Sequence, residues 1–278
     1  MSSYVKSIVN FQRMIDERNK LTLAAIDACR EVGDDALPPA DLMSYIGSNN
    51  VSHFRSNMEY FFKELVSRFN LDSSSRILDL GCGCGRMAFP FINFLVNGKY
   101  IGLDVWEKGI DWCKKNFNHP NAEFVCLASK NNYYDNQARS DVKNKYSLAA
   151  IEDRTIDLLF ATSVFTHLTW DDAALYFEDM KRVLRPGGCA YITCFKLDRF
   201  FYSYSEKTGD FIDIKEDEIN AGCFYGYSGQ DFFAGHSPES LNNLIELSGL
   251  ELISFELGSW AAKPSATHYQ DLIVLCKN

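Results

Sequence analysis

Glycines at alternate positions, directly after a short apolar segment, restrict the fold of this chain more than any other feature. The apolar segment Ile77–Leu80 runs into Gly81, Gly83 and Gly85, and an apolar stretch over about residues 86–96 follows. Glycine permits positive φ and lets a ligand approach the backbone closely. A buried strand, a glycine turn and a helix N-terminus with free N–H groups together suit a bound carboxylate.

The hydrophobic pattern changes from helical to alternating strand and helix along the chain. Helices are expected over residues 1 to about 30 and 54–69. Short apolar runs that predict strands follow at Arg76–Leu80, Tyr100–Asp104, Glu123–Leu127, Ile156–Ala161, Cys189–Phe195, 250–257 and 271–276. Helical stretches separate most of these strands, which is typical of βαβ units. The sequence therefore predicts a doubly wound α/β fold.

The ends of two expected helices carry clear signals. Thr169 followed by Asp172 predicts a helix start, and Ser237-Pro238 predicts another that ends at Gly249. Arg185-Pro186-Gly187-Gly188 is expected to stop the first of these helices before the strand Cys189–Phe195.

Residues 196–235 interrupt the alternation and are rich in Phe and Tyr. Irregular connections of this length are uncommon, so this insertion is expected to have its own structure. We interpret it as a cap over a substrate, with a partner interface or an extended core as the alternatives. The expected division is an N-terminal helical cap over 1–70 and the main domain over 71–278.

The composition favours an intracellular protein that does not bind nucleic acid. The net charge is −9, which opposes binding to a phosphate backbone. Nine cysteines, with no apparent leader or membrane segment, predict free thiols in the cytoplasm. The spacing of Cys82 and Cys84 does not suit a zinc site, so no metal is expected.

A carboxylate is predicted beside the glycine turn. Asp104 lies nineteen residues after Gly85 and closes the second expected strand. In a doubly wound sheet that position is at the same edge as the turn, where a carboxylate can accept both ribose hydroxyls of an adenosine. Trp106 follows closely and is expected to cover the adenine ring.

The glycine spacing separates two classes of cofactor. Nicotinamide dinucleotides are bound by Gly-x-Gly-x-x-Gly, whereas here Arg86 follows Gly85 directly and Asp79 precedes Gly81 by two positions. The pattern Asp-x-Gly-x-Gly-x-Gly resembles that of class I S-adenosylmethionine-dependent methyltransferases. Ser163–Leu168 after the fourth strand and Leu184–Gly188 before the fifth are also similar to that family.

The resemblance covers about residues 55–278 and implies a Rossmann-like, seven-stranded mixed sheet with an antiparallel seventh strand. It implies S-adenosylmethionine as cofactor, bound by Asp79, Gly81, Cys82, Gly83, Gly85, Arg86, Asp104, Val105, Trp106, Ser129 and Ser163. One departure from the family is the absence of an acidic residue after the third strand. Ser129 or a backbone group is the expected substitute.

His167 is the expected general base for an oxygen or nitrogen acceptor, because it follows the fourth strand at the ligand-binding edge. The alternative is a structural histidine bonded to backbone. His236 either approaches the same pocket or lies at the surface. Arg55 either reaches the cofactor carboxylate or is solvated, and helix capping explains Asp171 and Asp172 better than catalysis.

The sequence thus predicts a methyltransferase for a small-molecule or glycan-type acceptor, resembling most closely the branch that includes glycan and secondary-metabolite pathways. Two alternatives stay open. The chain could bind S-adenosylmethionine without catalysis, as a regulatory or scaffold protein, or be a nicotinamide-dependent oxidoreductase. The acceptor and the oligomeric state are not predicted.

Overall fold

Seven strands form one mixed sheet, in the order β3-β2-β1-β4-β5-β10-β9. Their bounds are β1 Arg76–Leu80, β2 Lys99–Asp104, β3 Ala122–Cys126, β4 Ile156–Ala161, β5 Leu184–Cys194, β9 Glu251–Glu256 and β10 Asp271–Cys276. β2 is parallel to β1 and β3, and β4 is parallel to β5, whereas β10 runs antiparallel to both β5 and β9. The predicted mixed α/β sheet is confirmed.

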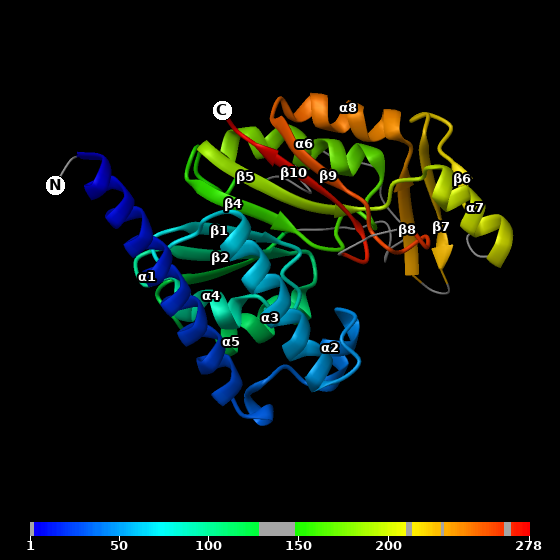
Figure 1. Cartoon of the computed structure of the whole chain (residues 1–278). Helices are drawn as coiled ribbons and strands as arrows, with labels where there is room; N and C mark the ends of the chain where they lie inside the picture. The colour runs from blue at the N-terminus through cyan, green and yellow to red at the C-terminus, as the bar shows by residue number, and fades with distance from the viewer. Residues whose placement is uncertain (1–2, 128–147, 210–212, 229–230, 264–267) are drawn as a thin grey trace. The chain divides into compact units, whose positions relative to one another are not determined.

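The computed structural model describes residues 3–127, 148–209, 213–228, 231–263 and 268–278 (Figure 1). The chain divides into two compact units, Met1–Cys126 and Leu127–Asn278.

The first unit surrounds β1–β3 with helices. They are α1 Ser3–Glu31, α2 Ala40–Tyr45, α3 Val51–Arg68, α4 Ala88–Phe94 and α5 Glu107–Asn116, with a 3-10 turn at Asp34–Ala36. Between α3 and α4, the ring of Phe62 packs edge-on against Phe91 and Phe94, with centroids 5.1 and 5.6 Å away. All three rings are fully buried, so this contact is a main support of the N-terminal helices.

α2 lies between the two N-terminal helices expected from the sequence and was not expected itself. The helix has only six residues, which is too short to show a hydrophobic period, and no side chain caps its start at Pro39. Its buried residues Leu42 and Met43 join the same core cluster as Cys84. Tertiary packing, rather than a local signal, therefore holds this helix in place.

In the second unit, α6 Trp170–Val183 and α8 Pro238–Ser248 lie side by side (Figure 1). The hydroxyl of Thr169 accepts a hydrogen bond from the backbone N–H of Asp172, and Ser237 does the same for Ser240. Gly249 ends α8 with φ of +60°. The start signals of both helices and the end of α8 are confirmed.

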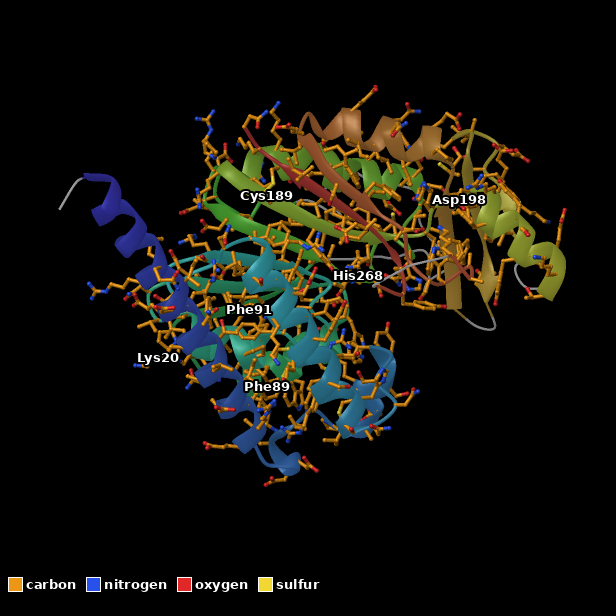
Figure 2. The ribbon with its side chains drawn as sticks, viewed as in Figure 1. Lys20, Phe89, Phe91, Cys189, Asp198 and His268 are labelled. Carbon is orange, nitrogen blue, oxygen red and sulfur yellow. A yellow bond between two sulfur atoms is a disulfide. The ribbon has the colours of Figure 1, made fainter. Side chains whose placement is uncertain are left out.

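The insertion has a structure of its own, as expected from its length. It contains α7 Arg199–Thr208 and a three-stranded antiparallel sheet of β6 Lys215–Glu216, β7 Cys223–Ser228 and β8 Asp231–His236. Asp198 caps α7 by accepting from the N–H of Phe200 (Figure 2). A separate core cluster of buried residues lies beneath it: Leu197, Phe201, Phe233, Trp260 and Ala261.

Two expectations about β5 are wrong. The strand begins at Leu184 instead of Cys189, because Gly187 and Gly188 exchange backbone hydrogen bonds with Lys277 beyond the end of β10. Cys189, on β5 (Figure 2), is also not a free thiol but forms a disulfide with Cys276. The two residues are directly opposite in the antiparallel β5–β10 pair, which brings their Cα atoms to 4.1 Å.

Candidate functional site

Asp104 lies against the glycine loop at the end of β2. Its Oδ2 accepts the backbone N–H of Gly83 at 2.6 Å, and its Oδ1 accepts that of Trp106 at 2.8 Å. Burial raises the pKa of this carboxyl group, and the backbone N–H donors oppose the rise. A carboxylate has about four acceptor positions, so two hydroxyl groups can still bind here.

The loop itself is held to the neighbouring strand. The N–H groups of Gly81 and Cys82 both donate to the carbonyl of Leu103, at 2.7 and 3.0 Å. Together with the Gly83 bond to Asp104, these contacts use three successive N–H groups within the unit. They shape the loop and are not free for a ligand.

Gly83 and Gly85 are required by space as well as by backbone conformation. Both have positive φ, of +57° and +78°. A Cβ at residue 83 would lie 2.5 Å from a methyl carbon of Ile46, and one at residue 85 would lie 2.6 Å from the ring of Phe117. The segment after α2 therefore packs directly on the loop.

Asp79 and Arg86 are buried on either side of the glycines. The hydroxyl of Tyr100 donates to Asp79 at 2.5 Å, and burial raises the pKa of Asp79 to about 7. Arg86 donates to the hydroxyl of Ser48 at 3.3 Å, and burial lowers its pKa. Its Nε has no partner among the residues that the structure describes. Asp79 and Arg86 both carry bonds that hold this region together.

Trp106, predicted to cover adenine, already has an aromatic partner. Its ring stacks on Tyr45 with centroids 4.0 Å apart and an interplanar angle of 19°. Gly109 lies against the same indole ring, because a Cβ there would be 2.4 Å from Trp106. In this arrangement Tyr45 covers one face of the indole. Val105 follows Asp104 and is partly buried.

In the second unit, Ser163 follows β4 with φ of +59°, which is uncommon for a residue other than glycine. Its N–H donates to the Thr193 hydroxyl at 2.8 Å, which donates to Gln270 Oε1 at 2.5 Å. The amide of Gln270 returns to the Ser163 hydroxyl at 2.9 Å. The sequence gives no signal for Thr193, because its partners Ser163 and Gln270 come close to it only when β5 pairs with β4 and β10.

His167 lies in the same loop and is exposed. Its Nδ1 is 2.5 Å from the carbonyl oxygen of Phe232 on β8. The N–H of Ala234 donates to Thr166 at 2.8 Å, and the hydroxyl of Tyr225 accepts from Trp170 at 2.7 Å. The insertion sheet therefore holds the loop after β4 at three places, one of which is the predicted base.

Two other candidates, Arg55 and His236, have clear outcomes. Arg55 donates to the carbonyls of Cys29 and Val32 at 2.6 and 2.5 Å, so it holds the end of α1 and is neither solvated nor aimed at a ligand. His236 is 1 % exposed, which excludes the surface alternative, and burial lowers its pKa to about 4. Ser129 lies outside the described residues.

A buried ion pair, which has no signal in the sequence, fixes the start of the insertion. Lys263 lies 2.8 Å from Asp271, and both side chains are fully buried. Asp271 also accepts the N–H of Lys196 at 2.7 Å and the indole N–H of Trp260 at 2.7 Å. A buried charge needs such partners, and here they join the insertion to β10.

The comparisons with known proteins agree with this architecture. Residues 78–192 match the family model described as a methyltransferase domain. A malonyl-[acyl-carrier protein] O-methyltransferase of Acetivibrio thermocellus is 28 % identical over 44 % of this chain and 47 % of the relative. A tRNA N(3)-methylcytidine methyltransferase of Schizosaccharomyces pombe is 34 % identical over 46 % of this chain and 39 % of that protein. The chain thus matches less than half the length of these curated relatives.

Among solved structures, a S-adenosylmethionine-dependent methyltransferase of Leishmania major has a TM-score of 0.51 and 17 % identity, over 92 % of this chain and 82 % of that one. A Pyrococcus horikoshii protein has a TM-score of 0.54 and 18 % identity, over 82 % and 93 %. These similarities support the fold.

The sheet order, the glycine loop and the matched domain define a class I methyltransferase fold. Residues 78–192 match a methyltransferase domain, and this match and the fold together support a class I S-adenosylmethionine-dependent methyltransferase. S-adenosylmethionine is therefore the cofactor, and the nicotinamide alternative is set aside. In the described part of the chain, no helix has the length and apolar character needed to cross a membrane.

Proposed function

We propose that the chain transfers a methyl group from S-adenosylmethionine to an oxygen or nitrogen of a small-molecule or glycan-type acceptor. The observation that carries this proposal is the contact of Asp104 with the N–H of Gly83 at 2.6 Å. It places a carboxylate with spare acceptor positions beside a glycine loop, which suits the ribose of an adenosine.

The cofactor supplies a methyl group already activated on a sulfonium, so the protein has to bind, orient and exclude water. Gly81–Gly85, Asp104 and Val105 would hold the adenosine, and Ser163 would contact the cofactor from the loop after β4. Trp106 would contact adenine with the part of its indole ring that Tyr45 does not cover. Asp79, Arg86 and Cys82 would support the loop from its buried side, and Ser129 remains a candidate contact from outside the described residues.

His167 is proposed to accept the proton of the acceptor hydroxyl or amine. Its exposed ring follows β4, and its Nδ1 is occupied by the Phe232 carbonyl. The acceptor lone pair would form the new bond to carbon while the carbon–sulfur bond breaks toward sulfur, and the released proton would pass to Nε2.

The relatives are named for different acceptors, including malonyl-[acyl-carrier protein], a tRNA and phthiotriol dimycocerosates. A small acceptor is favoured here by the insertion sheet that borders His167. The net charge of −9 argues against a polyanion such as tRNA.

Two measurements test the proposal. Calorimetry should show binding of S-adenosylmethionine and none of nicotinamide dinucleotides. Release of S-adenosylhomocysteine should then be followed against pools of small metabolites, glycans and tRNA. Release with the small-molecule or glycan pool supports the proposal, and release with tRNA alone contradicts the acceptor class. Cofactor binding with no release from any pool would favour a non-catalytic regulatory or scaffold role.

A further inference from the structure

A cavity of about 540 Å³ opens on the insertion sheet β6-β7-β8. Its volume lies in the range of sites that bind small organic molecules. Its lining includes both aromatic rings and carboxylates, and all of its residues belong to the insertion.

The aromatic part consists of Tyr225, Tyr227 and Phe232. The rings of Tyr225 and Phe232 stack with centroids 5.7 Å apart, and Tyr227 meets Phe232 edge-on at 6.0 Å. The hydroxyl of Tyr225 accepts the N–H of Trp170, which fixes the position of its ring. Tyr227 is exposed, and the face of an aromatic ring carries the negative side of its quadrupole, which attracts cations.

The polar part is strongly acidic. Its lining contains one cationic residue, Lys215, and four carboxylates: Asp213, Glu216, Asp217 and Glu218. Turn contacts hold two of these carboxylates in place: Glu216 accepts the N–H of Gly222 at 2.7 Å, and Asp217 accepts that of Asn220 at 2.6 Å. An anionic ligand would be repelled from this cavity, whereas a cation would meet carboxylates and ring faces together.

Phe232 connects the cavity with the predicted base. Its ring lines the cavity, and its carbonyl oxygen contacts Nδ1 of His167 at 2.5 Å. A molecule held against the Phe232 ring would therefore contact the same residue that binds His167.

We propose that this cavity binds the protonated amine of the methyl acceptor, and that the acceptor is a small organic cation with an apolar or aromatic part. This inference rests on the proposed function and narrows its acceptor class. The amine would lie between the carboxylates and the rings, while another oxygen or nitrogen of the same molecule receives the methyl group.

The ligand test uses three molecules of nearly equal shape: 2-phenylethylamine, 2-phenylethanol and phenylacetate. Calorimetry on the full chain without cofactor should show the amine binding at least about tenfold more tightly than the alcohol, and no binding of the acid. Raising the salt concentration from about 0.05 to 0.5 M should weaken only the amine, because the carboxylates are exposed. Equal affinities for amine and alcohol would overturn the proposal.

The protein test compares two double variants with the same change in net charge. Asp213→Asn/Glu218→Gln removes two carboxylates of the cavity, and amine affinity should fall about tenfold or more. Glu178→Gln/Glu246→Gln changes exposed residues of α6 and α8 and should leave it unchanged. Tyr227→Leu should weaken the amine more than Tyr227→Phe does. An unchanged affinity in the first double variant would also overturn the proposal.

The readouts separate this inference from the proposed function. Binding of the amine needs no cofactor, and binding of S-adenosylmethionine needs no acceptor. Tight cofactor binding without amine selectivity would remove the cavity from the acceptor site and leave the methyltransferase proposal intact. Amine selectivity without binding of S-adenosylmethionine would overturn the methyltransferase proposal and leave the cavity as a cation-binding site only.

Discussion

The ring Nδ1 of His167 lies 2.5 Å from the carbonyl oxygen of Phe232. A carbonyl oxygen only accepts hydrogen bonds, so Nδ1 carries the proton, and in the neutral ring Nε2 keeps its lone pair. Because Phe232 belongs to β8, the insertion sets the tautomer of a histidine in the loop after β4. This relationship fits a base whose free nitrogen is presented in the form that accepts a proton.

His167→Gln and His167→Asn should both lower turnover by about 10²–10⁴-fold, because neither amide can accept the acceptor's proton as an imidazole does. S-adenosylhomocysteine release measures turnover, and calorimetry should show the affinity for S-adenosylmethionine almost unchanged.

The pair of variants also separates catalysis from structure. The amide of Asn can replace the Nδ1 donor toward Phe232, so His167→Asn should melt closer to the unchanged protein than His167→Gln does. Full turnover with a lower melting temperature in either variant would show that His167 is structural.

Asp104→Ala should weaken binding of S-adenosylmethionine by about 1–3 kcal/mol, the cost of losing hydrogen bonds to a charged group. Part of this loss would come from the loop, since Asp104 also holds the N–H groups of Gly83 and Trp106. Calorimetry measures the affinity, and thermal melting reports the loop contribution. Asp111→Ala, an exposed carboxylate on α5, is the control for charge. Equal affinities in the two variants would exclude Asp104 from the site.

The sequence predicts the elements of this fold well where the signal is local. Strands β1 to β5, the caps at Thr169 and Ser237 and the end at Gly249 follow from apolar runs, hydroxyl side chains and positive φ. Each of these features depends on a few neighbouring residues, so it can be predicted from the sequence alone.

Contacts between segments that are distant in the sequence cannot be predicted from local signals. The disulfide of Cys189 with Cys276 spans 87 residues and depends on the antiparallel pairing of β5 with β10. The stacking of Tyr45 on Trp106 depends on a six-residue helix that only tertiary packing supports. Arg55 could not be assigned because two of its partners are backbone carbonyls, which have no sequence signature, and the third is the distant Asp34.

Reduction of the Cys189–Cys276 disulfide should lower the free energy of unfolding by about 2–4 kcal/mol, because the cross-link restricts the unfolded chain. Urea denaturation with and without dithiothreitol measures the effect. The variant Cys189→Ser/Cys276→Ser should be as unstable as the reduced protein and should not respond to dithiothreitol. A response of the same size in that variant would assign the effect to other cysteines.

Asp79→Asn should change the pH dependence of stability. The pKa of Asp79 rises from 3.8 to about 7 on folding, because burial outweighs the hydrogen bond from Tyr100, while the charge of Asp104 raises it and that of Arg86 lowers it. The folded chain therefore keeps a proton that the unfolded chain has already released between about pH 4 and 7. Over this window the contribution of Asp79 to stability falls as the pH rises, and above pH 7 it stays at its lowest value.

Asparagine does not titrate, so the variant should lack this contribution. The difference in unfolding free energy between the variant and the unchanged protein should move in favour of the variant by on the order of 4 kcal/mol from pH 4 to pH 8. Urea denaturation at several pH values measures that difference, in which the titration of all other groups cancels. Because the hydroxyl of Tyr100 can still donate to the asparagine oxygen, the bond between residues 79 and 100 is retained. A difference that does not change with pH would show that Asp79 is ionised throughout the range in the folded protein.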